Sequence, residues 1–378
     1  QKNETRKELV MKKALKLNVP IIYLNMVGGQ DELVFDGGSF VVNDLGEIIY
    51  QASSFQEEVF HLDIDLKIKK QNSKSSLTTR PKTTELKDVK SKPSLSENES
   101  IYSALKLGLL DYVSKNKFTK VLIGISGGID SALTAAICVD ALGSENVLGV
   151  AMPSKYNSKE SLEDAITLSD NLGINLKIIE IEKIVDSFRE VLANSLKEEL
   201  GQITDENIQS RVRGNILMGL SNQTGAMVVS TGNKSEMAVG YSTLYGDLAG
   251  GFALIKDLYK TKVYELSNYR NSISDAIPEN IISKEPSAEL RPNQFDSDSL
   301  PDYEVLDKIL NLYIEEDSSS ERIIASGVQP GLVYDVLEKV DRNEYKRKQV
   351  APGVKLTQKA FGKDRRMPIT NTYIRQKE

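Results

Sequence analysis

The sequence has one cysteine, Cys138, and one histidine, His61, in 378 residues. A single cysteine excludes an internal disulfide framework and any zinc site built on Cys-x-x-Cys pairs, and a single histidine excludes most metal centres and triads that depend on histidine. Cys138 lies in the apolar run 135–139, so we expect a buried small side chain rather than a nucleophile. His61 lies in the alternating run 59–64, which predicts a strand with this side chain pointing outward, and we assign it no role.

Long apolar runs and an excess of basic residues are also missing. No run approaches the ~20 apolar residues that a membrane helix needs, and no charged-then-apolar signal segment opens the sequence. The 48 Lys and Arg residues are outnumbered by 54 Asp and Glu residues, so the net charge of −6 indicates no nucleic-acid or polybasic membrane surface. We therefore expect a cytoplasmic protein that acts on small molecules, in a chain long enough for two domains.

Two common phosphate-binding motifs are absent. No G-x-x-x-x-G-K-[ST] sequence occurs, because the only Gly-Lys pair, Gly362-Lys363, is followed by Asp364. No G-x-G-x-x-G sequence follows a predicted strand. These absences exclude a P-loop and a Rossmann dinucleotide fingerprint.

The most informative segment that is present links an apolar run, 121–125, to a helix-like run, 132–142. Its residues are Gly124, Ile125, Ser126, Gly127, Gly128, Ile129, Asp130 and Ser131. Adjacent glycines let several backbone N–H groups point into one concavity at a helix N-terminus, where the dipole favours an anion. Phosphates would repel Asp130 unless a cation lay between them, so the pattern predicts Mg-ATP as the ligand. The alternative is an ordinary Gly-rich turn after a core strand.

The N-terminal part of the sequence differs in composition from the rest. Residues 67–100 are rich in Lys, Ser, Thr and Pro, which is typical of a flexible linker. Before the linker, the patterns predict a helix at 4–17, a turn at 43–46, and strands at 20–27, 40–42, 48–50 and around 59–64. A mainly stranded segment of this size does not easily close a core alone, and the sequence starts at Gln1. We interpret residues 1–66 as the end of a domain whose beginning is absent from this sequence.

After the linker, predicted strands and helices alternate. The strands are 121–125, 147–152, 176–181 and 226–230, and the helices are 131–142, 158–173 and 185–200. This alternation predicts an α/β fold with a doubly wound parallel sheet. Ligands in such sheets bind beyond the carboxyl ends of the strands. Ser126 and Thr231 each follow a strand directly, so we expect them to face one crevice.

The loop 126–131 (SGGIDS) resembles the pyrophosphate loop of the ATP pyrophosphatase superfamily. With Arg211-x-Arg213 and the segment 231–247 (TGNKSEMAVGYSTLYGD), it resembles the NAD synthetases. Further similarity lies at 256–260, 286–290 and 365–371. The segment 28–39 (GGQDELVFDGGS) resembles the end of a nitrilase-like glutaminase domain. This order of domains is that of the glutamine-dependent NAD synthetases, and the resemblance covers nearly the whole sequence.

The resemblance implies a fold of the adenine nucleotide alpha-hydrolase-like type for residues 101–378, preceded by the C-terminal remnant of an α/β nitrilase-like domain. It implies that residues 124–131 and Thr231 bind ATP, and that Asp130 and Glu236 share magnesium. The residues that it assigns to deamido-NAD (nicotinate adenine dinucleotide) are Asn207, Arg211, Glu236 and Lys346. Lys2 lies near a position where related enzymes have a lysine that touches glutamine.

The resemblance also implies a ligase reaction of NAD biosynthesis. In the family, the nicotinate carboxylate attacks the α-phosphate of ATP, pyrophosphate leaves, and ammonia displaces AMP to give NAD. No side chain acts as a nucleophile in this step, so we assign no catalytic residue. The partners expected are ATP, deamido-NAD, and ammonia or glutamine, and we expect a homo-oligomer.

Each assigned residue also has a simpler interpretation. Arg211 and Arg213 are compatible with solvated helix charges, and Glu236 with an acid favoured at a helix N-terminus. Lys346 lies in a charged run, 344–348, which is usually surface. The stretch 289–303 is interpreted as a mobile loop that orders over bound substrate.

The first domain departs from its family, because the nitrilase-type Glu-Lys-Cys triad is absent and the family's cysteine lies upstream of the matched region. Two alternatives to an NAD synthetase stay open. One is another ligase with the same loop and an amidotransferase partner, such as GMP synthetase; the segment 231–247 argues against it. The other is an adenine-nucleotide sensor without catalysis, against which Asp130, Thr231 and Glu236 count together.

Overall fold

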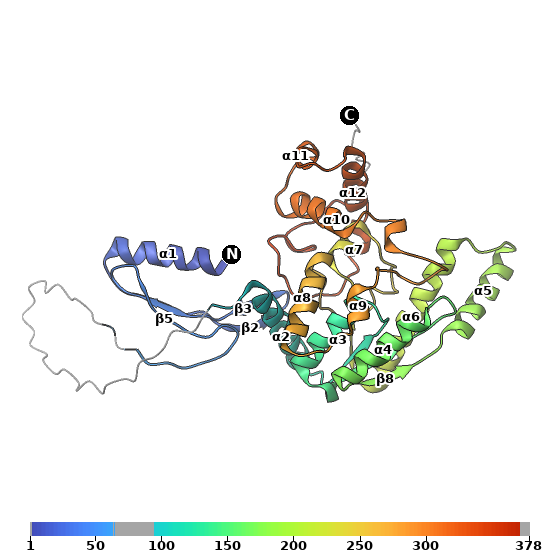
Figure 1. Ribbon diagram of the computed structural model, residues 1–378, viewed down its shortest axis with the longest axis horizontal. Coiled ribbons are helices and arrows are strands. Elements are labelled where there is room, and N and C mark those ends of the chain that lie inside the picture. Colours follow the sequence, from blue (N-terminus) through green and yellow to red (C-terminus); the bar gives the residue numbers. More distant parts are fainter. Residues whose placement is uncertain (1, 63, 65–93, 371–378) are drawn as a thin grey trace, which may run out of the picture. The chain divides into compact units, whose positions relative to one another are not determined.

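The computed structural model describes residues 2–62, 64 and 94–370, which divide into two compact units (Figure 1). The first unit comprises Gln1–Gly28 and Val34–Glu97, and the second comprises Gly29–Leu33 and Asn98–Glu378. Most of the predicted linker lies outside the described residues. Helix α2 (Glu97–Lys115) begins within the segment 67–100.

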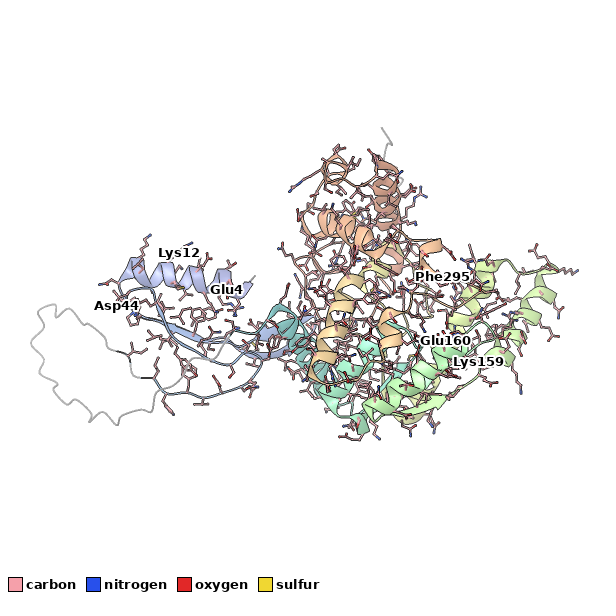
Figure 2. The ribbon with its side chains drawn as sticks, in the orientation of Figure 1. Glu4, Lys12, Asp44, Lys159, Glu160 and Phe295 are labelled. Atoms are coloured by element: carbon pink, nitrogen blue, oxygen red, sulfur yellow. The ribbon has the colours of Figure 1, made fainter. Side chains whose placement is uncertain are left out.

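The first unit combines helix α1 (Lys2–Leu17) with a three-stranded antiparallel sheet of order β1-β4-β5. Its strands are β1 (Ile21–Tyr23), β4 (Phe40–Val42) and β5 (Ile48–Gln51). Side chains alternate across a strand, so Phe40 and Val42 pack with Val10 and Ala14 of α1, whereas Val41 packs in a separate cluster. Helix α1, strands β4 and β5 and the turn between them are close to the prediction; Figure 2 labels Lys12 of α1 and Asp44 of the turn.

Two predictions for the first unit are wrong. Residues 59–62 form no strand: Phe60 packs partly buried against the cluster around Val41 and Tyr50, while His61 is exposed. An alternating apolar pattern can therefore cover a sheet without pairing with it. The predicted strand 20–27 ends at Tyr23, and β2 (Val27–Gln30) pairs instead with β3 (Leu33–Asp36). Glycines weaken strand propensity, which is why the sequence did not predict β2.

The second unit is built on a five-stranded parallel sheet of order β10-β9-β6-β7-β8. The strands are β6 (Val121–Gly124), β7 (Val147–Ala151), β8 (Asn175–Ile178), β9 (Met227–Ser230) and β10 (Phe252–Ala253). The chain leaves β6 toward β7 and β8 and later returns to the other side of β6 for β9 and β10. The carboxyl ends of β6 and β9 are thus neighbours at the point where the strand order reverses, which is where open α/β sheets bind ligands.

Helices cover both faces of this sheet, as predicted for a doubly wound fold. Helix α3 (Ile129–Leu142) contacts β6 and β7, α4 (Lys159–Leu172) contacts β7 and β8, and α8 (Lys260–Ile273) packs on α3. On the other face, α5 (Glu182–Leu196) and α6 (Gln202–Thr224) pack against alternate strand residues such as Leu122 and Val228. Figure 1 labels α3, α4, α6 and α8 in this unit, with β8 at its edge next to α4.

A second apolar cluster in this unit carries the C-terminal helices. Its residues come mainly from α7 (Lys234–Val239), α10 (Tyr303–Leu310), the π-helical turn Asn311–Glu315, α11 (Ser320–Ala325) and α12 (Pro330–Arg342). Helix α13 (Glu344–Arg347) packs on α7 and α12, and α9 (Glu279–Ser283) packs on α3 and α8. Buried Ala238 and Val239 place α7 in this cluster. No helix within the described ranges is both long and apolar enough to cross a membrane.

Cys138 is fully buried on α3, as expected, and burial raises the pKa of its thiol well above the ordinary value. The change Cys138→Ala should lower the free energy of unfolding by about 1–2 kcal/mol, because it truncates one packed atom. Urea unfolding measures this, and turnover should stay within a few-fold of wild type. Rapid labelling of the native thiol, or loss of turnover with the fold intact, would contradict this assignment.

Candidate active site

The loop between β6 and α3 is fixed by its own serines before any ligand binds. The Ser131 hydroxyl donates to the carbonyl of Gly128 at 2.9 Å and lies 3.1 Å from the Ser126 hydroxyl. The backbone N–H of Ser126 donates to the Ser131 Oγ at 3.2 Å. Gly128 is the N-cap of α3, and no side chain caps this helix end. An uncapped helix N-terminus next to a pre-ordered glycine loop is well suited to bind an anion.

Gly127 is the loop residue that tolerates no side chain. Its φ is +81°, a conformation that L residues rarely adopt, and a Cβ would lie 2.2 Å from the carbonyl oxygen of Ser161 at the start of α4. The change Gly127→Ala should therefore displace the loop and weaken ATP binding at least ~10-fold, measured by calorimetric titration. Gly219→Ala is the control, because it lies inside α6 with no atom within 4 Å of the added Cβ. Equal affinity of the Gly127→Ala variant and this control would refute the assigned role.

The two acids predicted to share a metal lie close together, because both contact one lysine. The Lys260 ammonium group donates to Asp130 Oδ2 in a short contact and lies 3.4 Å from Glu236 Oε1. The side chain of Asn233 donates to Asp130 Oδ1 at 2.9 Å. The carboxylates of α3 and α7 are thus brought together at the carboxyl edge of the sheet, beside the phosphate loop.

Local capping chemistry places Glu236. The Asn233 Oδ1 atom accepts from the N–H of Glu236 at 2.9 Å, and the Glu236 carboxylate accepts from the N–H of Asn233 at 3.5 Å, which is a capping box at the start of α7. The Asn-x-x-Glu spacing in the sequence is typical of such a capping box. The sequence alone points to no role for Asn233 or Lys260, which lie in the segments 231–247 and 256–260 that carry the family resemblance.

The electrostatics of this cluster are suited to a divalent cation. Burial and then the charge of Asp130 raise the pKa of Glu236 to about 8, although Lys260 opposes the shift, and Asp296 and Asp247 add further negative charge. A bound cation favours the ionised form of a carboxyl ligand. No group of three or more His, Cys, Asp or Glu side chains forms a metal cage in the described part of the chain. Two carboxylates next to a phosphate loop still fit Mg²⁺, which commonly combines one or two carboxylates with substrate phosphates.

Three of the four residues predicted to bind deamido-NAD contact the segment that follows α7, and the fourth, Glu236, lies in α7 itself. Asn207 Oδ1 accepts from the Thr243 hydroxyl at 2.7 Å, and Arg211 Nε donates to the Leu244 carbonyl at 3.2 Å. Lys346 Nζ donates to the carbonyls of Gly240 and Ser242 at 2.6 and 2.8 Å. Burial lowers the pKa of Lys346, so its side chain is not a free surface charge. The structure gathers these side chains around one segment, 240–247.

The remaining predicted residues lie elsewhere. Thr231 directly follows β9, beside the phosphate loop. Arg213 is half-buried; its guanidinium donates to the Met152 carbonyl and the Asn157 side chain at 3.0 Å each, and loss of solvation lowers its pKa to about 10. Arg213 is thus not a solvated helix charge. Lys2 begins α1 in the first unit, and its side chain lies outside the described residues.

A buried lysine that the sequence did not single out supports α7. Lys234 is fully buried at the first position of α7, and its ammonium group pairs with Asp257 at 2.7 Å and Glu315 at 2.6 Å. It also donates to the Thr357 hydroxyl at 2.6 Å. Because breaking a buried ion pair leaves an uncompensated charge, this network ties the helix that carries Glu236 to the C-terminal segment.

Comparison with known proteins gives one consistent result. The family model described as NAD synthase matches residues 101–350. The chain is 50% identical over 390 residues to the glutamine-dependent NAD(+) synthetase of Thermotoga maritima, which covers 97% of this chain and 67% of that protein. It is similar to the solved glutamine-dependent NAD+ synthetase of Acinetobacter baumannii in complex with ADP (TM-score 0.67, 46% identity, 97% of this chain and 65% of that one). It is also similar to the NH3-dependent NAD synthetase of Campylobacter jejuni (TM-score 0.54, 30% identity, 67% and 96%).

Proposed function

The chain belongs to the NAD synthase family, and from this premise we propose that it converts deamido-NAD, ATP and ammonia into NAD, AMP and pyrophosphate. The observation that carries the proposal is the placement of two acids, Asp130 and Glu236, beside a phosphate loop at the switch point of the sheet. The chain spans about two thirds of the length of the glutamine-dependent relatives it matches. Any activity that depends on the full length of those relatives, such as the use of glutamine, is therefore also a proposal for this chain.

ATP would bind with its phosphates over residues 124–131 and Thr231. The uncapped N-terminus of α3 and the N–H groups of the loop supply the positive end of a dipole to the phosphates. The solved relative that carries ADP supports an adenine nucleotide as ligand. No other phosphate loop was found in the sequence.

Asp130 and Glu236 would hold magnesium, whose chemistry would be to neutralise the charge of the departing pyrophosphate. The chain's own residues position the reactants. The nicotinate carboxylate of the dinucleotide attacks the α-phosphorus, the bond to the β-phosphate oxygen breaks, and pyrophosphate leaves. Ammonia then attacks the adenylated carboxyl carbon and forms the C–N bond of the amide. The bond from this carbon to the AMP oxygen breaks, and AMP leaves. Because no side chain becomes covalently bonded, most of the rate enhancement comes from orientation and electrostatic stabilisation.

Asn207, Arg211, Glu236 and Lys346 would bind the dinucleotide. Two observations support this assignment. Asn207 and Arg211 lie in α6 and Glu236 lies in α7. The side chains of Asn207, Arg211 and Lys346 all contact the segment 240–247. Cationic and amide side chains of this kind suit a ligand that carries a carboxylate and a diphosphate.

The ammonia source is a separate part of the proposal. The first unit resembles the end of a glutaminase domain, and Lys2 at the start of α1 is the residue there that we connect to glutamine. In a longer protein of the glutamine-dependent type, ammonia would be released in such a domain and consumed at the site described above. For this chain, free ammonium is the substrate that we propose.

A surface of the second unit supports the expected homo-oligomer. On α5, Ile184, Phe188 and Val191 recur at helical spacing and are 40, 44 and 66% exposed. We propose that a second copy of the chain covers this stripe, since an apolar helix face is normally buried. The change Phe188→Glu should shift the mass measured by light scattering toward the monomer, whereas Lys183→Glu, off the stripe, should not. A wild-type monomer at assay concentrations would contradict this proposal.

The products of ATP cleavage test the proposed reaction against its alternatives. With magnesium and ammonium present, AMP and pyrophosphate should form only when deamido-NAD is added, because the substrate carboxylate is the nucleophile. Release of ADP and phosphate would contradict the proposal. No cleavage with any acceptor would favour the nucleotide sensor, and cleavage driven by xanthosine monophosphate would favour a GMP synthetase.

A further inference from the structure

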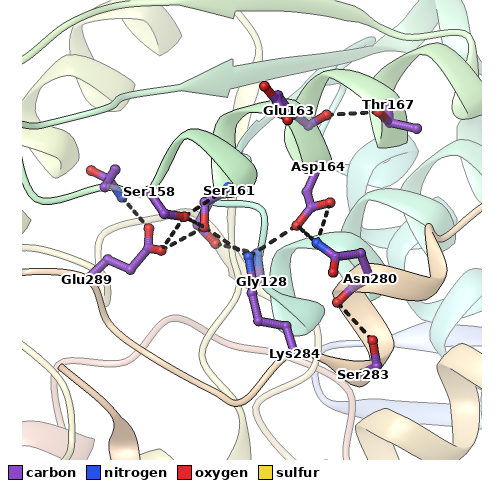
Figure 3. Close-up of polar contacts among 12 residues, drawn as sticks. Gly128, Ser158, Ser161, Glu163, Asp164, Thr167, Asn280, Ser283, Lys284 and Glu289 are labelled. Atoms are coloured by element: carbon purple, nitrogen blue, oxygen red, sulfur yellow. Dashed lines mark hydrogen bonds and ion pairs between the residues drawn. The ribbon is translucent and has the colours of Figure 1, made fainter. Parts of the chain in front are cut away.

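The segment that follows α9 is fastened to the start of α4 by one carboxylate (Figure 3). Glu289 Oε1 accepts from the hydroxyls of Ser161 at 2.7 Å and Ser158 at 3.1 Å, and Glu289 Oε2 accepts from the Asn157 side-chain amide at 2.7 Å. Ser158 is the N-cap of α4. Figure 3 shows Glu289 reaching toward these serines from the segment opposite the helix.

We propose that Glu289 is a positioning residue that holds the segment 284–296 on α4 and, through Ser161, holds α4 against the phosphate loop. Its role is to set the affinity for ATP without touching the nucleotide. The inference rests on the proposed function only in taking the loop 124–131 as the ATP site.

Ser161 is the link between Glu289 and the loop. The carbonyl oxygen of Ser161 lies so close to Gly127 that an added Cβ there would approach it to 2.2 Å. The hydroxyl of the same residue donates to Glu289 and accepts from Lys284 Nζ at 2.9 Å. A shift of this turn of α4 would therefore change the packing surface on which Gly127 rests.

Lys284 and its neighbours fasten the other end of the segment. Lys284 Nζ lies 3.2 Å from Asp164 Oδ2, and the Asn280 side chain donates to both oxygens of Asp164 at 3.0 and 2.8 Å. Figure 3 shows these contacts on the next turn of α4. Segment 284–296 is thus attached to α4 at two successive turns.

The backbone at Glu289 shows that these contacts hold it in a costly conformation. Its φ is +48°, in the left-handed region that is uncommon for residues other than glycine. The backbone of the next residue is also held, because the Gln209 side chain donates to the carbonyl of Leu290 at 2.9 Å. Such a conformation persists when surrounding contacts determine it. Figure 2 labels Phe295 farther along the segment and Lys159 and Glu160 in the first turn of α4.

The orientation of the Asn157 side chain is fixed by partners on both sides. Asn157 Oδ1 accepts from Arg213 Nη2 at 3.0 Å and from the N–H of Ser154 at 2.8 Å, so its amide group is left to donate to Glu289. The guanidinium of Arg213 and the carboxylate of Glu289 therefore lie on opposite sides of one amide group and carry opposite charges. An amide in place of the carboxylate would keep the hydrogen-bonding capacity but lose this charge.

The variants follow from these contacts. Glu289→Ala removes all three hydrogen bonds, whereas Glu289→Gln can keep most of them because the serine hydroxyls can either donate or accept. Glu285→Gln is the matched control, since Glu285 lies in the same segment but is exposed and accepts from Ser297, not from α4. Ser161→Ala removes the linking hydroxyl and leaves the backbone under Gly127.

Calorimetric titration with α,β-methylene ATP tests the proposal on the full chain. We expect Glu289→Ala to bind roughly tenfold more weakly than wild type, Glu289→Gln to recover most of the affinity, and Glu285→Gln to match wild type. The double variant Glu289→Ala/Ser161→Ala should bind no worse than Glu289→Ala alone, because both changes break one link. A merely structural role would give additive losses and no recovery by glutamine.

The outcomes that overturn the proposal are distinct. If wild type binds the nucleotide and Glu289→Ala binds equally well, or if Glu285→Gln is weakened as much, the positioning role is wrong and the proposed function stands. If wild type does not bind the nucleotide, the ATP site itself is wrong and the positioning role is overturned with it. If Glu289→Ala does not fold, the affinities of Ser161→Ala and Glu289→Gln for the nucleotide test the proposal instead. Wild-type affinity of Ser161→Ala would then overturn the positioning role.

Discussion

Replacing Asp130 by asparagine should lower the rate of NAD formation at least ~100-fold while the protein stays folded. Asp130 contributes a carboxylate at the start of α3 that contacts both Lys260 and Asn233. The asparagine keeps the shape of the side chain and removes its negative charge, so the proposed magnesium ion would be held more weakly. Steady-state rates at saturating ATP, deamido-NAD and ammonium measure the effect.

Glu236→Gln should produce a loss of similar size for the same reason. The exposed Asp170 on α4 supplies the control, and Asp170→Asn should leave the rate unchanged. Raising the magnesium concentration should recover part of the rate in both site variants, because occupancy follows mass action. Wild-type rates in both variants would show that these acids do not hold a metal.

The 378-residue chain should make NAD from ammonium but not from glutamine. Release of ammonia by a nitrilase-type route needs a cysteine thiolate, a base and a lysine that stabilises the oxyanion, all in one pocket. Residues 1–66 contain no cysteine, and Cys138 is fully buried on α3 with a raised pKa. Free ammonium bypasses this requirement, because ammonia attacks the adenylated carboxyl carbon directly.

The comparison needs glutamine that is free of ammonia, so an enzymatic ammonia trap is included in the glutamine assay. Ammonium chloride without the trap is the positive control. NAD formation from trapped, ammonia-free glutamine would show that this chain has a glutaminase site that its sequence does not reveal. NAD formation from neither source would count against the synthetase site instead.

Local patterns predicted the elements that position the site. The apolar runs and caps around β6, α3, β7 and α4 lie within one stretch of chain, so their periodicity and turn chemistry could be read directly. Helix α4, with Ser158 as its N-cap and Gly173 as its C-cap, coincides with the predicted helix 158–173. The doubly wound sheet followed from the alternation of strands and helices, and the structure confirms it.

Side-chain contacts between residues far apart in the sequence could not be predicted from local patterns. Lys260 reaches Asp130 across 130 positions, and Lys234 meets Glu315 across 81. No spacing rule connects such residues, because only the folded arrangement of the helices and the sheet brings them together. The same holds for Glu289, which lies in the predicted mobile loop 289–303, and Ser161, which lies in the predicted helix 158–173. In the structure, Glu289 is fastened by hydrogen bonds.

One measurement tests the central claim most directly. The chain is incubated with ATP, magnesium, deamido-NAD and ¹⁵N-ammonium, and the products are identified by mass spectrometry. The account predicts NAD that carries ¹⁵N in its amide group, with AMP and pyrophosphate formed in equal amounts to it. Unlabelled NAD, ADP in place of AMP, or no NAD at all from a folded chain that binds ATP would contradict the account.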